Sequence, residues 1–299
     1  MKRIWRAVAT AVAGSTALAA AVLAPSATAQ AAPLTRVPPR PSSMLAGTWV
    51  NRNAKTESLA ALVISTTKAS ISVDGFGACT PSFCQWGKVA GTVYGPNVSA
   101  TAGTAFEAQW DFKFARTVLL ARLSTFRGMV PTLTVEELTT FTDGSGRANY
   151  AVTETFTKGN GPRATMTGTS AANFPLGDSR APDASLLRTW VNPAASGTIS
   201  KVILSVNPST GQLAVQAFGY CSPVACDWGT VTGTTFGTSV SSSTASTFLA
   251  PYVFGFAGKL LEGSVNAGGT RLTVRSWTEF TDHSGRANYD TTETLVPGS

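Results

Sequence analysis

The chain has 299 residues, of which 13% are charged and 43% hydrophobic, and 28 are Gly. The 23 Lys and Arg exceed the 16 Asp and Glu, giving a formal net charge of +7, but the basic residues are scattered and form no run interleaved with aromatics. This distribution excludes the basic footprint of a nucleic-acid-binding protein. Low charge and abundant Thr, Ser, Gly and Ala are typical of an exported β-protein rather than of a disordered chain.

The N-terminal segment, residues 1–29, has the pattern of a secretory signal peptide. Three basic residues within the first six positions precede an alanine-rich apolar run over 7–23, and small residues at 27–29 offer a cleavage site. A membrane anchor is the alternative, but the apolar run is shorter than the roughly 20 residues that a spanning helix needs. We therefore expect a secreted, extracellular protein with no stable membrane span.

The rest of the chain contains two copies of one pattern. Three landmarks recur at offsets of 141, 142 and 139 residues: Trp49 as Trp190, Cys79–Gly87 as Cys221–Gly229, and Phe141–Tyr150 as Phe280–Tyr289. Each copy is about 110 residues long and therefore a whole folding unit, larger than a solenoid repeat. We predict a signal peptide over 1–29, a Pro-rich lead-in over 30–44, repeat 1 over 45–157, a linker over 158–185 and repeat 2 over 186–299.

Short runs of alternating or β-branched residues between turn signals predict eight strands in each repeat, and no convincing helical period appears after the signal peptide. The ranges are 46–51, 58–65, 69–78, 84–94, 104–114, 116–124, 131–142 and 147–157 in repeat 1. In repeat 2 they are 188–193, 199–206, 211–220, 226–236, 240–249, 251–261, 270–281 and 286–296. The sequence predicts an all-β chain of two tandem eight-stranded antiparallel up-and-down barrels, because closure removes exposed sheet edges. A two-sheet sandwich is the alternative.

All four cysteines belong to the two copies of a Cys-x-x-x-x-Cys element, Cys79 with Cys84 and Cys221 with Cys226. Export and equal placement favour one disulfide within each copy. Such short loops contribute only about 2 kcal/mol each in the chain-entropy model. A shared zinc site of four thiolates is the alternative, and we expect neither a metal nor a cofactor.

The last hairpin of repeat 1 allows side chains to be assigned to faces. If Thr142 pairs with Arg147 across the turn, then Phe141 faces Ala148, Glu137 faces Val152 and Val135 faces Glu154. The core face then holds Leu133, Val135, Phe141, Tyr150, Val152 and Phe156. The opposite face, expected to be solvated, holds Thr134, Thr140, Thr142, Arg147, Asn149 and Thr153.

This register turns Glu154 toward the core, and the same reading of repeat 2 turns Glu293 inward beside Tyr289. Glu137 shares the core face, but its counterpart is Ser276, so only Glu154 and Glu293 recur. An inward carboxylate is unfavourable unless it is paired or hydrated. Each therefore either meets an internal Arg or Tyr or lines a wet cavity.

Catalytic sets are poorly represented. The single histidine, His283, has Gly144 as its counterpart, which excludes a His-dependent triad in each repeat and a cluster of His metal ligands. Asp143 and Glu154 lie roughly seven residues apart along the hairpin, on the order of 20 Å, which is too far for a glycosidase pair. We predict no catalytic residue.

Two sequence motifs resemble those of known protein families. Gly47-Thr48-Trp49-Val50-Asn51 resembles the opening strand of the calycin barrels, the lipocalin and avidin group, and Trp277 to Tyr289 resembles the late avidin hairpin, with two aromatics at the same spacing. Together these resemblances imply that Asn51, Asn192, Trp277 and Tyr289 line the open end of a ligand-binding barrel. No aspartate matches the one that closes the avidin site, so biotin is not inferred. Cys-x-Pro-x-x-Cys-x-Trp-Gly followed by Phe-Thr-Asp-x-Ser-Gly-Arg-x-Asn-Tyr is similar to a group of exported bacterial proteins, which implies an exported bacterial origin and no activity.

We expect a secreted non-catalytic binding protein with one site per repeat for a small-molecule or saccharide ligand. The expected site residues are Glu154, Tyr150 and Trp49 in repeat 1, and Glu293, Tyr289 and Trp190 in repeat 2. The alternative roles are structural: Trp49 and Trp190 would plug a barrel end, and Tyr150 would fill core. The alternative function is an interaction or inhibitor module that holds an extracellular protein through the disulfide-closed loops 80–83 and 222–225. A hydrolase is the third hypothesis.

Overall fold

The computed structural model describes residues 39–79, 82–125, 129–160, 176–178, 180–194 and 196–298, which all lie within one compact unit of the chain. The expected signal peptide, most of the expected lead-in and much of the expected linker lie outside the described residues. Among the described residues, no helix has the length and apolar character that crossing a bilayer requires.

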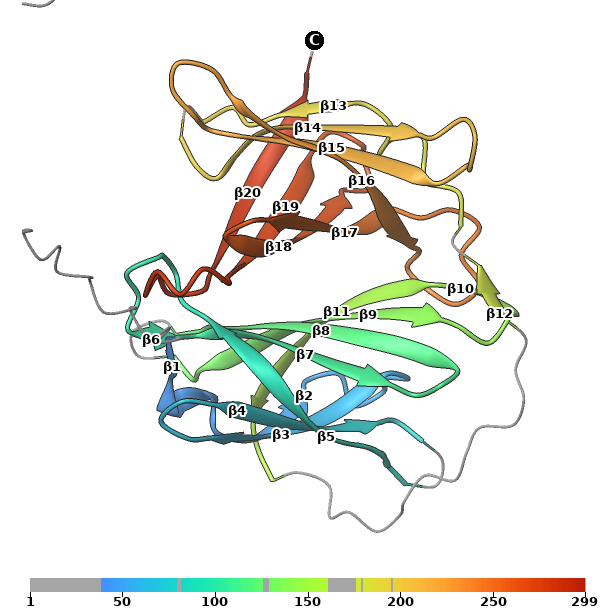
Figure 1. Cartoon of the computed structure of the whole chain (residues 1–299). Helices are drawn as coiled ribbons and strands as arrows, with labels where there is room; N and C mark the ends of the chain where they lie inside the picture. Colours follow the sequence, from blue (N-terminus) through green and yellow to red (C-terminus); the bar gives the residue numbers. More distant parts are fainter. Residues whose placement is uncertain are drawn as a thin grey trace, which may run out of the picture. The chain divides into compact units, whose positions relative to one another are not determined.

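Each repeat forms a closed antiparallel barrel of eight strands, which confirms the predicted fold class (Figure 1). Barrel 1 consists of β2 (Gly47–Asn51), β3 (Leu59–Thr66), β4 (Ile71–Gly77), β5 (Cys84–Tyr94), β7 (Ala105–Asp111), β8 (Ala115–Ser124), β9 (Thr132–Phe141) and β11 (Tyr150–Lys158). Barrel 2 consists of β13 (Thr189–Val191), β14 (Ile199–Val206), β15 (Leu213–Gly219), β16 (Cys226–Phe236), β17 (Thr247–Phe254), β18 (Ala257–Val265), β19 (Leu272–Phe280) and β20 (Tyr289–Pro297). In each barrel the strands pair in chain order, and the last strand closes on the first.

Two short parallel pairs lie outside the barrel ladders. β1 (Arg40–Pro41) pairs with β6 (Ala102–Gly103), and β10 (Ser145–Ala148) pairs with β12 (Leu176–Asp178). β12 lies within the range expected to be linker.

Each barrel has its own apolar core, anchored by the tryptophan of its first strand. Trp49 and Trp190 are fully buried. The indole Nε1 of Trp49 donates to Leu45 O at 2.8 Å, and that of Trp190 donates to Leu186 O at 3.0 Å. In barrel 1 this contact is made by the short 3-10 helix Ser43–Leu45, which precedes β2 and therefore lies at the end of the barrel away from the 52–58 loop.

The predicted strands 240–249 and 251–261 were wrong, because the structure has one strand, β17, across the predicted gap at residue 250 and begins the next, β18, at Ala257. Pro251 lies inside β17 with its side chain exposed, opposite Leu260 of β18. The ladder between β16 and β17 has already ended at Leu249, so the missing N–H of Pro251 interrupts no pairing with β16.

The register predicted for the last hairpin of repeat 1 is confirmed from Thr132 to Thr139, with Val135 opposite Glu154 and Glu137 opposite Val152. Two of its pairs, Phe141 with Ala148 and Thr142 with Arg147, were wrong. The ladder starts at Tyr150, while residues 145–148 turn away as β10 to pair with β12. The side chain of Asn149 takes over part of the lost pairing, because its Oδ1 accepts from the Phe141 N–H at 3.1 Å.

The face of this hairpin expected to be solvated is covered in part, because the two barrels pack against each other there; Thr142 is exposed as expected. Asn149 is 2% exposed and Leu138 is 1% exposed, whereas Thr153 is exposed as expected. A separate apolar cluster joins the barrels: Tyr94, Ala105, Leu120, Leu138, Phe236 and Trp277. The backbone contacts across the interface are reciprocal, since Gly95 bridges to Tyr289 and its counterpart Gly237 bridges to Tyr150.

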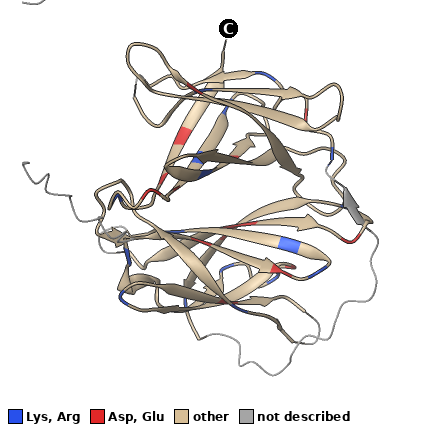
Figure 2. Ribbon diagram, viewed as in Figure 1, with Lys and Arg blue, Asp and Glu red and all other residues tan. Residues whose placement is uncertain are grey.

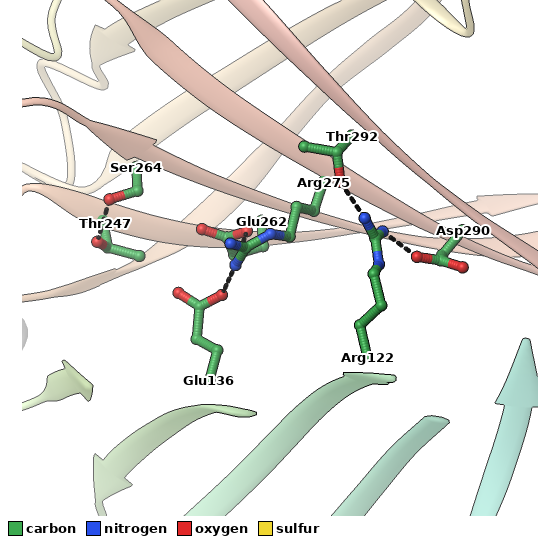
Figure 3. A network of polar contacts seen from close by, with 8 residues as sticks. All are labelled: Arg122, Glu136, Thr247, Glu262, Ser264, Arg275, Asp290 and Thr292. Carbon is green, nitrogen blue, oxygen red and sulfur yellow. Dashed lines mark hydrogen bonds and ion pairs between the residues drawn. The ribbon is translucent and has the colours of Figure 1, made fainter. Parts of the chain in front are cut away.

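Charged residues are sparse on both barrels (Figure 2). Several of them nevertheless lie together between the two barrels, where they form ion pairs. Arg275 of β19 reaches across to Glu136 of β9 and also lies 3.4 Å from Glu262 of β18 (Figure 3). From the other barrel, Arg122 of β8 pairs with Asp290 and donates to the hydroxyl of Thr292 at 2.7 Å. The interface therefore combines an apolar cluster with buried carboxylates that pair with partly exposed arginines.

Candidate functional site

The open end of barrel 1 contains a cavity of about 950 Å³. It is surrounded by the loops that join β2 to β3, β4 to β5, β7 to β8 and β9 to β11, and residues 238–240 of barrel 2 complete its rim. The volume is at the upper end of the roughly 300–1,000 Å³ typical of small-molecule sites. Connecting loops held by a rigid barrel are frequent positions for binding residues.

Five aromatic residues line the cavity beside polar and charged ones: Trp86, Phe112, Phe114, Phe141 and Tyr150. The Trp86 ring packs edge-on against Trp110 and Phe112, with centroid distances of 5.6 and 5.5 Å. Two glycines of β4 give the indole its place, because a Cβ on Gly77 would lie 2.5 Å from Trp86 Nε1 and one on Gly75 would lie 2.9 Å from its ring. Packing against the two glycines of β4 therefore fixes the position of the Trp86 indole.

Glu137 is the most enclosed charged group in the cavity, and its side chain projects inward from β9 at 3% exposure. Its carboxylate accepts hydrogen bonds from Ser58 Oγ, from the Tyr150 hydroxyl at 2.8 Å and from Thr139 Oγ1 at 3.1 Å. Burial raises the pKa of Glu137, the three hydroxyl donors counteract that rise, and the nearby negative charge of Glu154 adds to it.

Glu154 and Tyr150, two of the expected site residues, lie together in this cavity on the inner face of β11. Burial also raises the pKa of the Tyr150 hydroxyl. Among the described residues, no hydrogen bond or ion pair is formed by the Glu154 side chain. Trp49, the third expected residue, is packed in the core beneath Leu45 and does not line the cavity.

In barrel 2 the corresponding interior contains a lysine. Lys259 Nζ donates to Ser276 Oγ at 3.0 Å and lies 4.8 Å from the Trp228 ring centroid and 5.5 Å from that of Tyr289. Burial lowers the pKa of Lys259 to about 8, and the charge of Glu293 partly counteracts this.

The expected residues of repeat 2 are divided between the inner face and the core. Burial raises the pKa of Glu293. The backbone N–H groups of Thr198 and Ile199 donate hydrogen bonds to its Oε1 and counteract that rise. Tyr289 packs against Phe280 at a centroid distance of 6.0 Å. Trp190 is buried beneath Leu186, as Trp49 is beneath Leu45.

Both predicted disulfides are present, with Cα–Cα distances of 5.6 Å for Cys79–Cys84 and 5.5 Å for Cys221–Cys226. The first lies at the rim of the barrel 1 cavity. Within the part of the chain that the structure describes, no group of three or more His, Cys, Asp or Glu residues lies close enough to hold a metal ion.

Other residues singled out in the sequence have structural contacts. Arg147 pairs with Asp143 at 2.7 Å and Arg286 pairs with Asp282 at 2.6 Å, which holds the last turn of each barrel. Asn51 donates to Leu59 O at 2.8 Å at the end of β2. Trp277 lies on the outer face of barrel 2 against Tyr94, with a centroid distance of 5.2 Å, so it lines no barrel interior.

The sequence analysis did not identify two features of the barrel interiors: the central position of Glu137 and the internal lysine of barrel 2. Glu137 does not recur, since its counterpart is Ser276, and Lys259, whose counterpart is Thr117, belongs to none of the motifs that recur. A comparison of the two repeats for positions that change charge would have found both.

Neither the models of known protein families nor the curated proteins include a match to this sequence.

Proposed function

We propose that the chain is an exported, non-catalytic binding protein and that the open end of barrel 1 takes up a small molecule. The observation that carries this proposal is the 950 Å³ cavity, whose aromatic walls surround the inward Glu137 and Glu154. An apolar enclosure with a few placed polar groups is the usual form of a small-molecule site. Closed barrels with disulfides at the loops suit such a role because little of the site has to be ordered on binding.

Two neighbouring residues of β11 allow a matched test of this site. Val152 points into the cavity, whereas Thr153 is exposed on the outer face. We expect the uncharged fluorescent probe N-phenyl-1-naphthylamine to bind the wild-type chain and Thr153→Trp at one site. Val152→Trp should weaken binding strongly because its indole occupies the part of the cavity beside Glu137 and Glu154. Circular dichroism would establish that both variants are folded, and equal binding by both would contradict the proposal.

Export is tested on the same protein. We expect the secreted chain to begin at Gln30, after removal of the signal peptide, when its N-terminus is determined by mass spectrometry. Native mass spectrometry of the culture supernatant should then show a co-purifying small mass.

Protein binding is a second candidate function, supported by the exposure of the disulfide-closed loop Ser222–Ala225, in which Val224 is 72% exposed. A rigid exposed loop binds with a small loss of conformational entropy. In the native spectrum, a protein-sized partner that is lost in Val224→Asp would favour this function over small-molecule uptake.

A further inference from the structure

The two barrel interiors share most of their chemistry, because the repeats place the same residue types at equivalent positions. The equivalent pairs include Trp86 and Trp228, Tyr150 and Tyr289, Glu154 and Glu293, and Arg147 and Arg286. Strand register confirms the equivalence, since Glu154 lies opposite Val135 and Glu293 lies opposite Val274. Differences between the interiors can therefore be interpreted position by position.

Two adjacent positions change charge in opposite directions. Thr117 of β8 corresponds to Lys259 of β18, and Glu137 of β9 corresponds to Ser276 of β19. In barrel 1, Thr117 Oγ1 lies 2.8 Å from Thr139 Oγ1, which itself donates to Glu137. In barrel 2, Lys259 Nζ donates to the residue that replaces Glu137. On these inner strand faces barrel 1 therefore carries two carboxyl groups, Glu137 and Glu154, where barrel 2 carries one carboxyl and one ammonium group. The lysine that lines the barrel 1 cavity, Lys55, lies exposed with Glu57 in the loop at the mouth, away from the position of Lys259.

The surroundings of Lys259 show how this type of interior holds a cation. Its ammonium group has a hydroxyl acceptor in Ser276, two aromatic faces in Trp228 and Tyr289, and an attractive charge in Glu293. Aromatic faces attract ammonium groups within about 6 Å of the ring centroid. In barrel 1 the matching aromatic residues, Trp86 and Tyr150, line an open cavity instead.

We propose that barrel 1 binds an organic cation, a primary amine on an apolar body, whose ammonium group occupies the position that Lys259 Nζ holds in barrel 2. This inference rests on the proposed function, since it names the ligand class of the same cavity. The ammonium group would pair with Glu154 and Glu137 and lie against Trp86 and Tyr150. The apolar body would extend between Phe112, Phe114 and Phe141 toward the mouth.

Arg147 also lines the cavity, but it does not reverse this preference. Its guanidinium group is bound by Asp143 and lies over the Phe141 ring, 3.8 Å from the centroid. The twin Arg286 makes the same contacts in barrel 2, with Asp282 and with Phe280 at 3.9 Å, beside an interior that holds Lys259. The arginine is therefore compatible with a buried ammonium group.

Titration calorimetry of the full chain with matched probes tests the ligand class. 2-Phenylethylamine, 2-phenylethanol and 3-phenylpropionate share an apolar body and differ in charge, and tryptamine with tryptophol repeats the comparison on a larger body. We expect each amine to bind one site, at least tenfold more tightly than its alcohol, and the carboxylate to bind more weakly than either.

Three variants locate the effect. Glu154→Gln should keep the shape of the cavity and weaken amine binding at least tenfold, while binding of the alcohol is retained. Thr117→Lys, which introduces the lysine of barrel 2, should abolish amine binding. The matched control Lys259→Thr should leave the barrel 1 affinity unchanged. Thermal unfolding would establish that each variant is folded.

The outcomes separate this inference from the proposed function. If the alcohols bind as tightly as the amines, or if Glu154→Gln weakens amine and alcohol binding equally, the proposal of a cationic ligand is contradicted. The proposed uptake of a small molecule is not contradicted by either result. If the amines still bind Thr117→Lys at wild-type affinity, the assigned position of the ammonium group is wrong. If neither these probes nor N-phenyl-1-naphthylamine bind, both proposals fail.

Discussion

Glu137 illustrates how a buried carboxylate is made tolerable by its neighbours. Ser58, Thr139 and Tyr150 all direct hydroxyl groups at it from different strands or loops, so desolvation is opposed by three hydrogen bonds. A buried acceptor that loses a donor keeps its desolvation penalty and loses the compensation. The Tyr150 hydroxyl is therefore important for stability as well as for the shape of the cavity.

Tyr150→Phe should reduce the free energy of unfolding by about 1–3 kcal/mol at pH 7 and raise the pKa of Glu137 further. Urea denaturation measures the first effect. Tyr289→Phe is the matched control, since no hydrogen bond of the Tyr289 hydroxyl is found among the described residues, and we expect it to change stability much less. Equal losses in the two variants would contradict the account of Glu137.

At the scale of elements, the β4–β5 hairpin positions one wall of the cavity. Gly77 pairs with Cys84, the disulfide joins that cysteine to Cys79, and Trp86 follows two residues later with its indole over Gly77. The φ of Gly77 is not in the left-handed region, so backbone conformation does not require a glycine at this position. A glycine is needed because any side chain would collide with the Trp86 ring.

Gly77→Ala should displace the Trp86 indole and reduce stability by about 1–3 kcal/mol, because an added methyl group in a packed site forces its neighbours to move. N-Phenyl-1-naphthylamine binding should weaken with it. Gly219→Ala makes the matching clash with Trp228 in barrel 2, at 2.8 Å, and should reduce stability without changing probe binding. Probe binding that stays at the wild-type level in Gly77→Ala would show that Trp86 forms no part of the site.

The sequence predicted these elements where local pattern determines structure. The alternation of apolar residues from Leu133 to Phe141 allows only one face of the strand to be buried. The register of the hairpin then places Glu154 on that face, as predicted. The prediction failed at Pro251, where tolerance depends on which neighbouring strand pairs there. It also failed on the outer face around Asn149, because a Thr-rich surface has the same pattern whether water or a second barrel covers it.

One sequence feature related to the association of the barrels is a pair of equivalent positions that carry opposite charges. Glu136 and Arg275 occupy equivalent positions in the two repeats and form an ion pair with each other. Local pattern cannot reveal that such residues meet, since their contact depends on the packing of two complete barrels.

At the scale of the whole molecule, Arg275 balances two buried carboxyl groups. Arg275→Ala should destabilise the full chain by about 3–5 kcal/mol at pH 7, because it leaves Glu136 and Glu262 buried without their cation. The loss should shrink at pH 4.5, where protonation of both groups removes the unpaired charge. The exposed pair Arg116–Asp111 supplies the control, since Arg116→Ala should change stability by less than about 1 kcal/mol.

The pH dependence of stability should reflect the same interface. Burial, followed by the nearby charge of Glu136, raises the pKa of Glu262 well above 4.5. The folded chain then binds more protons than the unfolded chain above pH 4.5, so the contribution of Glu262 to stability falls as the pH rises toward its folded pKa. Urea denaturation at pH 5, 6, 7 and 8 should show this decline in the wild type and a smaller one in Glu262→Gln. An unchanged slope in the variant would contradict the assignment.

The opposite signs at positions 136 and 275 also limit what this surface can pair with. In a symmetric dimer each residue near the axis meets its own copy. Two molecules joined through the first half alone would place carboxylate against carboxylate, and two joined through the second half would place guanidinium against guanidinium. A single polypeptide carrying both halves supplies the two signs in a fixed one-to-one ratio, so this contact is satisfied within the monomer and selects against self-association through either half.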